Sequence, residues 1–417
     1  MNTCLGLELG STRIKAVSID EAFQPVSSGD YTWASRFENG VWTYPLEEVW
    51  TGLKAAISKV EDRQTVAAMG VSAMMHGYLA FDRDWNLLTP FRTWQCTSTG
   101  PAAAELTELF GFNIPQRWSV AHLYQAVLNG EEHIFSIAHI TTLAGYVHHM
   151  LTGVNAVAPR TGNVSAGTSI FSMVVLEKPL KKVHEEIDLV TTPAGAPVAM
   201  VHCNNCTNDT NAWVSVLGEA ARLFGADPST GELYTRLYEK SLEGEADCGG
   251  VLVCNYLAGE GVTRMDAGRP LVARTPETRF TLANFFRAQL YATMATLKIG
   301  MDILAEEGVA IDSLTGHGGL FKTPVVGQSY LAAACGAPVT CMETAGEGGP
   351  YGMALLAAYM LGKSEGERLE DFLGKRVFAE TAGTTVRPDP ALAEGFNTYI
   401  HRYKALLKVE QTAVEHL

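Results

Sequence analysis

Short apolar segments open the chain and are separated by a polar turn. Leu5–Leu9 is apolar, Gly10, Ser11 and Thr12 follow it, and apolar and polar residues then alternate over Lys15–Ile19. Alternation with a period of two places successive side chains on opposite faces of a strand. The pattern therefore predicts a hairpin of two strands joined by a glycine-containing turn.

Helical spacing is clearest in two later segments. Apolar residues recur on one face over Pro45–Val60, where Pro45 suits the first turn of a helix. The same spacing holds over Thr281–Glu307, and Gly308 is placed to end that helix. We expect a helix in each segment.

The other predicted elements are shorter. They are strands over Val66–Met75 and Tyr78–Asp82, a largely helical region over Ala102–Leu151, and helices ending near Cys335 and covering Tyr351–Leu361. Thr161–Leu176 repeats the plan of the first hairpin, with a strand, a Gly-Thr-Ser turn and a second strand. This repetition indicates two related halves, each opening on a glycine-containing turn.

Composition narrows the class of protein. The chain has 417 residues, enough for two or three domains, and is 47% hydrophobic. Its net charge of −14 argues against nucleic acid or an anionic membrane as partner, although local backbone donors and a metal ion can still hold a nucleotide. No long apolar run or signal peptide is evident, and the eight cysteines are scattered. We expect a cytoplasmic protein with reduced thiols.

The first turn carries residues suited to a phosphate. Gly10 can adopt a positive φ, Ser11 and Thr12 add hydroxyl donors, and Lys15 can reach a phosphate as a point charge. Glu8 could hold Mg²⁺. An ordinary hairpin turn fits the same residues equally well, since short glycine-rich motifs are common.

Two further glycine-containing turns have related chemistry. SAGTS places small residues and bare N–H groups at a tight turn, and GHGGLFKTP could let a flat adenosine lie on the backbone, with a threonine that caps the next helix or touches a phosphate. The cofactor-binding candidates in these turns are Gly167, Thr168, Ser169, Gly318, Gly319 and Thr323. Each turn taken alone also fits a purely structural role.

The order of these elements resembles that of the FGGY carbohydrate kinases, in their xylulokinase-like branch. MMHG (Met74–Gly77) and FRTW (Phe91–Trp94) are similar to the sugar-contact segments, and GGLFKTPVVGQSYLAAACGAPV is similar to the second family signature. ETAGEGGPYGMALLAAY is similar to the helix that follows it. The resemblance covers nearly the whole chain and implies an α/β, actin-like ATPase (ribonuclease H-like) two-domain fold.

The resemblance also implies an activity. An FGGY kinase uses ATP and Mg²⁺ to phosphorylate a small-molecule sugar, a ketose or polyol, in a cleft between two domains. The expected domains are a sugar-binding domain over residues 1–156 and a nucleotide-binding domain over residues 157–417. The resemblance gives no nucleic-acid or membrane partner, and it leaves the oligomeric state open, with a homodimer among the alternatives.

Met75, His76 and Trp94 are the sugar contacts that the resemblance implies. Without it, His76 would be read as a core histidine between two strands, and Trp94 as a core aromatic residue. After the tryptophan the branch has an acidic or amide residue and a basic residue, whereas this chain has Gln95, Cys96 and Ser98, so the sequence does not identify the sugar.

The catalytic base expected from the family is missing. Family members carry it as an aspartate in a Gly-Asp motif before the second hairpin, but no aspartate lies between Asp84 and Asp188 here. We therefore expect a truncated first domain and leave the catalytic residue unknown. The alternatives are a kinase that has lost activity, a nucleotide- or sugar-binding protein, or another carboxylate such as Asp209 as base.

His202–Cys206, with the sequence HCNNC, invites a metal interpretation. A Cys-x-x-Cys pair needs a second ligand pair at suitable spacing, and Cys248 and Cys254 are too widely separated in sequence to form a second knuckle. A structural role is therefore the favoured interpretation.

Overall fold

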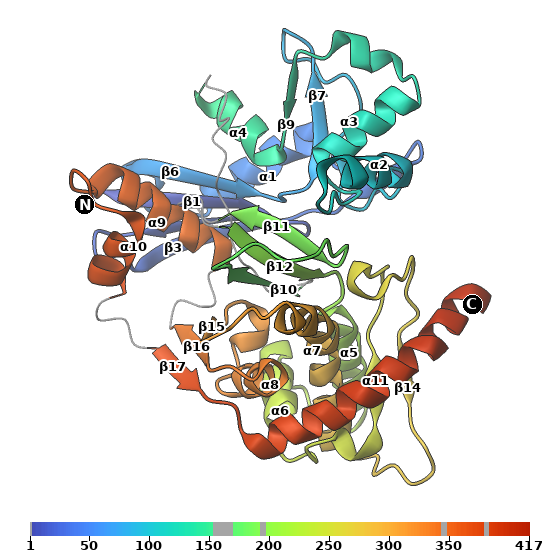
Figure 1. The fold of residues 1–417 in the computed structure, drawn as a ribbon. Coiled ribbons are helices and arrows are strands. Elements are labelled where there is room, and N and C mark those ends of the chain that lie inside the picture. The colour runs from blue at the N-terminus through green and yellow to red at the C-terminus, as the bar shows by residue number, and fades with distance from the viewer. Residues whose placement is uncertain (1, 153–169, 192–196, 343–347, 379–382) are drawn as a thin grey trace. The chain divides into compact units, whose positions relative to one another are not determined.

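The computed structural model describes residues 2–152, 170–191, 197–342, 348–378 and 383–417, drawn in colour in Figure 1. Contacts divide the chain into two compact units. The first comprises Met1–Asn163, Pro193–Gly195 and Glu347–Thr381, and the second comprises Val164–Thr192, Ala196–Gly346 and Ala382–Leu417. The units therefore have other bounds than the expected domains, 1–156 and 157–417, because the described residues 348–378 pack in the first unit.

A four-stranded sheet forms the centre of the first unit, in the order β3-β2-β1-β6. Its strands are β1 (Thr3–Leu9), β2 (Arg13–Ile19), β3 (Pro25–Thr32) and β6 (Val66–Ala73). The pairs β1–β2 and β2–β3 are antiparallel, whereas β6 runs parallel to β1. The predicted hairpin is confirmed as β1 and β2.

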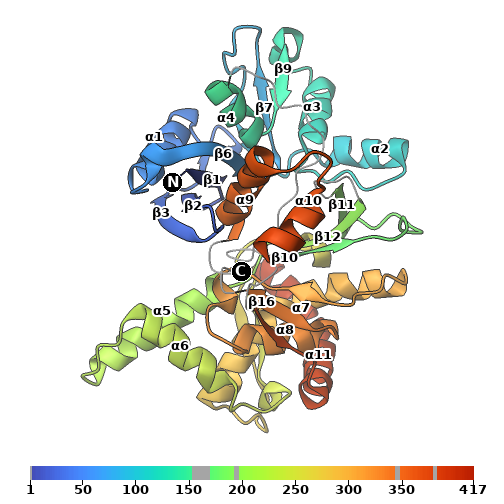
Figure 2. The same ribbon diagram turned by 90° about the vertical axis from the view of Figure 1, so that its left-hand side faces the viewer.

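Two helices cover opposite faces of this sheet, as Figure 2 shows: α1 (Leu46–Ser58) and α9 (Gly348–Gly362). Leu7 of β1 packs with Leu53 of α1, whereas Cys4 of β1 packs with Leu355 of α9. Side chains alternate between the faces of a strand, so the apolar run of β1 fills two cores at once.

Two glycines let α9 approach the sheet closely. Gly6 and Gly70 are partners in the β1–β6 ladder. A Cβ on Gly6 would lie 1.6 Å from the carbonyl oxygen of Pro350, and one on Gly70 would lie 2.4 Å from that of Met353. The helix backbone thus rests directly on the strand backbone, which only glycine permits at both positions.

A second sheet in the first unit has the order β8-β7-β9, and both of its pairs are antiparallel. Its strands are β7 (Gly77–Phe81), β8 (Arg92–Thr93) and β9 (His139–Thr141), and its helices are α2 (Gly100–Phe110), α3 (Ser119–Leu128) and α4 (Leu143–Thr152). The predicted helical region is confirmed for α2, α3 and α4, with β9 as its non-helical part. The remaining elements of this unit are β4 (Arg36–Glu38), β5 (Val41–Thr43), η1 (Arg63–Thr65), η2 (Glu132–Ser136), α10 (Leu369–Phe372) and η7 (Leu373–Val377).

The described residues of the second unit form three small sheets, in the orders β10-β12-β11, β13-β14 and β15-β16-β17. Their strands are β10 (Ile170–Val175), β11 (Ile187–Thr191), β12 (Pro197–Cys203), β13 (Leu252–Cys254), β14 (Leu271–Ala273), β15 (Leu314–Thr315), β16 (Val339–Met342) and β17 (Gly383–Val386). The helices are α5 (Asn208–Leu223), α6 (Thr230–Ser241), η3 (Cys248–Gly250), η4 (Gly261–Thr263), α7 (Leu282–Glu306), η5 (Gly319–Phe321), α8 (Val326–Cys335) and α11 (Pro390–His416).

The core of the second unit is built around α7, which is buried on nearly every side. The Thr281 side chain accepts a hydrogen bond from the Asn284 backbone and caps the helix, and Gly308 follows its end with a φ of 79°. The helix predicted over Thr281–Glu307 is confirmed. Its burial goes beyond the single apolar face that the sequence indicates, since polar residues such as Asn284, Arg287 and Gln289 are buried as well.

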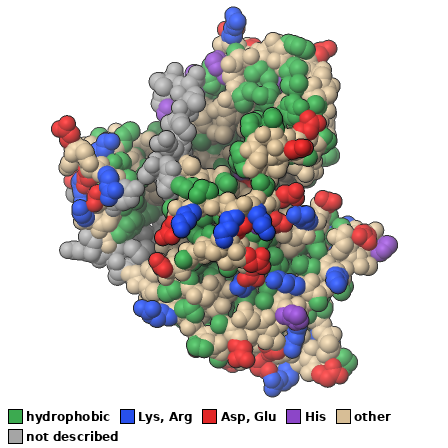
Figure 3. Space-filling view, viewed as in Figure 1, with side chains coloured by type: hydrophobic (Ala, Val, Ile, Leu, Met, Phe, Trp, Pro, Cys, Tyr) green, Lys and Arg blue, Asp and Glu red, His purple; other side chains and the backbone are tan. Residues whose placement is uncertain are grey.

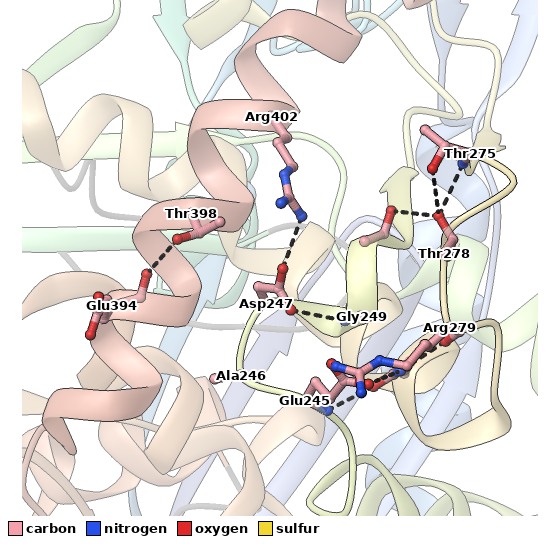
Figure 4. A network of polar contacts seen from close by, with 12 residues as sticks. Glu245, Ala246, Asp247, Gly249, Thr275, Thr278, Arg279, Glu394, Thr398 and Arg402 are labelled. Carbon is pink, nitrogen blue, oxygen red and sulfur yellow. Dashed lines mark hydrogen bonds and ion pairs between the residues drawn. The ribbon is translucent and has the colours of Figure 1, made fainter.

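The long helix α11 is attached to the second unit by apolar and polar contacts. Figure 4 shows the Arg402 guanidinium donating to Asp247 at 2.9 Å, while Asp247 also accepts from the Gly249 N–H at 3.1 Å. Glu245 pairs with Arg279 nearby. Tyr399, on the buried side of the helix, donates to the carbonyl of Val253 at 3.1 Å.

Surface charges of both signs are interspersed on the face seen in Figure 3, rather than gathered into one field. Within the described residues, no helix combines the length and the apolar character needed to span a bilayer.

Candidate functional site

The first turn and the Met-His-Gly segment lie at the same edge of the first unit's sheet. Because β1 and β6 are parallel, their carboxyl ends coincide, and the Met74 N–H donates to the carbonyl of Leu9 at 3.0 Å. The turn Gly10–Thr12 follows β1, and His76 follows β6. Segments at the carboxyl ends of parallel strands are common places for ligand sites.

Aromatic donors fix the peptide groups of the first turn. The Trp33 indole donates to the carbonyl of Gly10 at 2.7 Å, and the Tyr44 hydroxyl donates to that of Ser11 at 2.7 Å. Among the backbone hydrogen bonds of the described residues, none is donated by Ser11 or Thr12. With the carbonyls held on one side, these N–H groups remain able to bind an anion.

The expectation that Gly10 uses a positive φ is wrong, because its φ is not among the positive ones of the described residues. Its N–H donates to the carbonyl of Arg13 at 2.8 Å, and a Cβ would lie 3.1 Å from that same oxygen. The tight closure of the turn, rather than a left-handed conformation, therefore favours glycine here.

Glu8 and Lys15 are neighbours across the first hairpin, since they are partners in the β1–β2 register. Burial raises the pKa of Glu8, and the charge of Lys15 offsets part of that rise. Lys15 is also opposite Asp30 of β3. A half-buried carboxylate of this kind suits a hard cation such as Mg²⁺. The ammonium group of Lys15 has two acidic neighbours, Glu8 and Asp30, in addition to any bound phosphate.

Strand pairing brings His76 and Trp94 to neighbouring positions. Gly77 pairs with Thr93 and Tyr78 pairs with Arg92, so His76 and Trp94 flank the next position of the ladder. His76 is 9% exposed and Met75 is 43% exposed. Residues 18 positions apart in the sequence thus lie at neighbouring positions at one end of β7 and β8, and their contact with a sugar stays a prediction.

Gly77 is required by this geometry. Its φ is 139°, and a Cβ would lie 2.5 Å from the ring of Phe91. No other residue fits this backbone conformation without strain, so the glycine of the Met-His-Gly segment determines how the chain enters β7.

A polar network directly beside this pair was not expected from the sequence. Tyr78 and Arg92 contact Glu131 and His133, which follow α3. These residues lie some 40 to 55 positions apart in sequence, so no local pattern joins them. Arg92 lies in a strand and Glu131 in the segment between α3 and η2, so no local signal in the sequence links them.

The turn at Gly316–Gly319 in the second unit depends on its backbone. Gly318 has φ 102° and ψ −175°, a conformation that only glycine adopts readily, and Gly319 has open space where a Cβ would stand. His317 lies between them and the strand, with its Nδ1 buried and unpartnered among the described residues, and burial lowers its pKa. The sequence analysis missed His317 as a candidate contact.

The expectation that Thr323 caps the next helix is wrong. Val325 occupies the N-cap position of α8, with φ 69° and no side-chain cap, and Thr323 is buried two residues earlier. Proline at position 324 separates Thr323 from the helix start, so its hydroxyl cannot serve the first N–H groups. Its proposed phosphate contact stays a prediction.

The second hairpin is described only in part. Ile170–Val175 forms β10, which pairs with β12, so a strand is present where one was predicted. Gly167, Thr168 and Ser169 lie outside the described residues. Their phosphate-binding role remains a prediction.

The HCNNC segment belongs to the core of the second unit. Cys203 and Cys206 are buried free thiols, and burial raises the pKa of both. Beside them, Glu260 accepts hydrogen bonds from the N–H groups of Asn204 and Asn205 at 2.9 and 3.2 Å. The segment is a turn held by a carboxylate.

Asp209, the residue suggested as a substitute base, lies within α5 and is 7% exposed. Burial raises its pKa. Its side chain belongs to the core of the second unit.

Comparisons with known proteins agree with this arrangement. Residues 3–158 match the N-terminal domain of the FGGY family of carbohydrate kinases, and residues 162–361 match its C-terminal domain. A glycerol kinase from Thermococcus gammatolerans is 29% identical over 114 residues, a match that spans 26% of this chain and 23% of that relative's length.

Solved structures match over nearly the whole chain. A xylulose kinase from Lactobacillus acidophilus superposes with a TM-score of 0.76 and 14% identity, covering 99% of this chain and 100% of that one. A xyloylose kinase from Brucella ovis gives a TM-score of 0.70 and 19% identity over 98% and 99% of the two chains. The two-domain actin-like fold is thereby confirmed, and the chain belongs to the FGGY family of carbohydrate kinases.

Proposed function

We propose that this protein transfers the γ-phosphoryl group of ATP to a hydroxyl of a small sugar, a ketose or a polyol. One observation carries the proposal: at one edge of the first unit, the turn Gly10–Thr12 adjoins the segment that leads to His76, and strand pairing puts Trp94 beside it. A donor-rich turn next to an imidazole and an indole suits a phosphate next to a sugar.

Each candidate residue has a stated task. The N–H groups of Ser11 and Thr12 hold phosphate oxygens, and Glu8 holds Mg²⁺, which neutralises phosphate charge when bound. His76 forms a hydrogen bond with a sugar hydroxyl, as donor or acceptor, and Trp94 packs against the apolar face of the sugar. Met75 lines the entrance to this proposed sugar site. In the second unit, Gly318 and Gly319 accept the adenosine on their backbone.

A non-catalytic nucleotide- or sugar-binding protein is the second candidate. It is favoured by the absence of any aspartate between Asp84 and Asp188 in the sequence, the interval in which the family resemblance places the proton acceptor. Loss of such a base slows transfer by about 10²–10⁴-fold while leaving binding intact. In either case the eight free thiols fit a reducing cytoplasm.

Calorimetric titration with Mg-ATP, followed by D-xylulose and glycerol and a wider panel of ketoses and polyols, tests both candidates. A coupled assay records ADP release with each acceptor. Sugar-dependent ADP release supports the kinase, whereas binding without release supports the binding protein. Sugar-independent ATP hydrolysis, or no binding of either ligand by folded protein, contradicts both.

Gly318 and Gly319 form a matched pair for the nucleotide. Gly318→Ala strains a backbone with φ 102°, whereas Gly319→Ala adds a methyl group in open space. We expect Gly318→Ala to weaken Mg-ATP binding by about 10-fold and Gly319→Ala to change it by less than about 3-fold. Equal effects would argue against a backbone-built adenosine site.

A further inference from the structure

The strand that leads to Trp94 is too short to fix its own position. β8 contains two residues, Arg92 and Thr93, and is paired with β7 only through Gly77 and Tyr78. Two residue pairs specify a register weakly, and a slip of one residue would turn every side chain of β8 to the other face. Something besides the ladder must therefore hold His76 opposite Trp94.

Side chains of the pair Tyr78–Arg92 supply that hold. Arg92 forms a two-pronged ion pair with Glu131: its Nη1 donates to Oε1 at 3.1 Å, and its Nη2 donates to Oε2. The Tyr78 hydroxyl lies 3.0 Å from His133 Nε2, and His133 Nδ1 lies 3.4 Å from Glu131. The Arg92 guanidinium also stands 5.6 Å from the centre of the Tyr78 ring.

These four residues form a closed loop, which we call the β7–β8 clamp: Tyr78, Arg92, Glu131 and His133. Each strand of the short ladder contributes one member, and the segment after α3 contributes the other two. Both partners of the ion pair are mostly shielded, with side chains 12% and 24% exposed. A paired, two-pronged contact of this kind is stronger than an exposed one.

Neighbouring contacts complete the support. His122 of α3 is fully buried and stacks on the Tyr78 ring at a centroid distance of 6.1 Å. The Ser119 hydroxyl of the same helix donates to the carbonyl of Gly77. The Tyr78 ring and the Gly77 peptide are thus both held against α3.

We propose that the β7–β8 clamp positions His76 and Trp94 for the sugar acceptor. Tyr78, Arg92, Glu131 and His133 act as positioning residues, since they act through β7 and β8, the strands next to His76 and Trp94. The inference rests on the proposed sugar site. It gives Glu131 and His133 a role in acceptor affinity, although their segment carries none of the family motifs quoted from the sequence.

Glu131→Gln tests the clamp, with Glu132→Gln as the matched control, because the neighbouring Glu132 is exposed. Tyr124→Phe is the control for Tyr78→Phe. It removes a hydroxyl on the exposed side of α3, which donates a hydrogen bond to Glu105. We expect both test variants to raise the KM for the acceptor, D-xylulose or glycerol, by about 10-fold. The KM for Mg-ATP should stay within about 2-fold, and kcat should change less than the acceptor KM.

Glu131→Asp provides a rescue arm, since it keeps the charge and should recover part of the acceptor affinity that Glu131→Gln loses. A variant that merely loosens the fold would instead lower kcat and raise both KM values together. That result, or an unchanged acceptor KM in an active enzyme, overturns the proposal.

Hydrogen exchange separates failure of the clamp from failure of the proposed function. Peptides covering residues 74–80 and 91–96 should exchange about 10-fold faster in Glu131→Gln than in Glu132→Gln. If the protein neither binds nor phosphorylates a sugar but shows this faster exchange, the result supports the clamp and contradicts the proposed function. Unchanged exchange in these peptides contradicts the proposed role of the clamp, whether or not the protein is active.

Discussion

The two units hold glutamates in opposite ways. Glu131 of the first unit faces a cation, and the hydrogen bonds and charge of Arg92 lower its pKa. Glu260 of the second unit is 1% exposed and accepts hydrogen bonds from the backbone N–H groups of Asn204 and Asn205 and from the Asn205 side-chain amide, while burial raises its pKa to about 7. At Glu260 burial outweighs the amide donors, which lower the pKa, whereas at Glu131 the Arg92 guanidinium outweighs partial burial.

The direction of each pKa shift decides when each glutamate stabilises its unit. Glu131 binds protons less readily when folded, so its contribution is present above its ordinary pKa and is lost as the pH falls through its lowered value. Glu260 binds protons more readily when folded, so its contribution is present below pH 4.5 and declines as the pH rises towards about 7.

Removing the Glu260 side chain should have the largest effect on stability. Glu260→Ala leaves the donors of Asn204 and Asn205 without their buried acceptor, at a cost of about 4 kcal/mol. Trp213 is the only tryptophan of the second unit, so its fluorescence during urea unfolding reports on that unit. Glu243→Ala is the control, because its side chain is 64% exposed; an equal loss there would contradict the prediction.

The pH dependence of the second unit should come next in size. Between pH 4.5 and about 7 its free energy of unfolding should fall by on the order of 3 kcal/mol as Glu260 ionises. Glu260→Gln keeps the shape and removes this titration, so the stability reported by its Trp213 transition should fall less than that of wild type over the same range. A wild-type transition that strengthens with rising pH would reverse the assigned sign.

Glu131→Gln should cost about 2 kcal/mol in the first unit near pH 7, because the Arg92 guanidinium loses its charged partner. The difference from wild type should shrink as the pH falls below 4.5, where the wild-type carboxylate also becomes protonated. Unfolding of a Trp213→Phe background reports on the first unit. A difference that persists unchanged into acid would show that Glu131 does not act through its charge.

The smallest effect is expected at the exposed pair in Figure 4. Arg402 and Asp247 are 44% and 31% exposed, so Arg402→Ala should cost no more than about 1 kcal/mol. High salt should remove most of that cost, whereas it should leave the cost of Glu260→Ala unchanged. Thermal unfolding at low and high salt measures both.

Sequence patterns predicted what is local in this molecule. The hairpin of β1 and β2, the helix α1 and the buried α7 follow from periodicity and from their bounding residues. The closeness of His76 and Trp94 came from the family resemblance, because periodicity does not say which strands pair.

Long-range contacts were beyond such patterns. The β7–β8 clamp joins residues up to 55 positions apart, and the reason for glycine at position 10 is a neighbouring carbonyl rather than its own φ. Thr323 looked like a helix cap because threonine often is one, but the helix begins after Val325. In each case tertiary packing decided between local alternatives that the sequence leaves equal.

The contact of α9 with β1 has a consequence for synthesis. Pro350 touches Gly6, so a segment near residue 350 closes a core that begins at residue 3. During translation the first unit cannot complete its core until most of the chain has been made. The face of its sheet that α9 covers stays exposed while the intervening second unit is synthesised. Nascent chains arrested before residue 348 should therefore be the ones that recruit chaperones, and extension beyond residue 362 should release them.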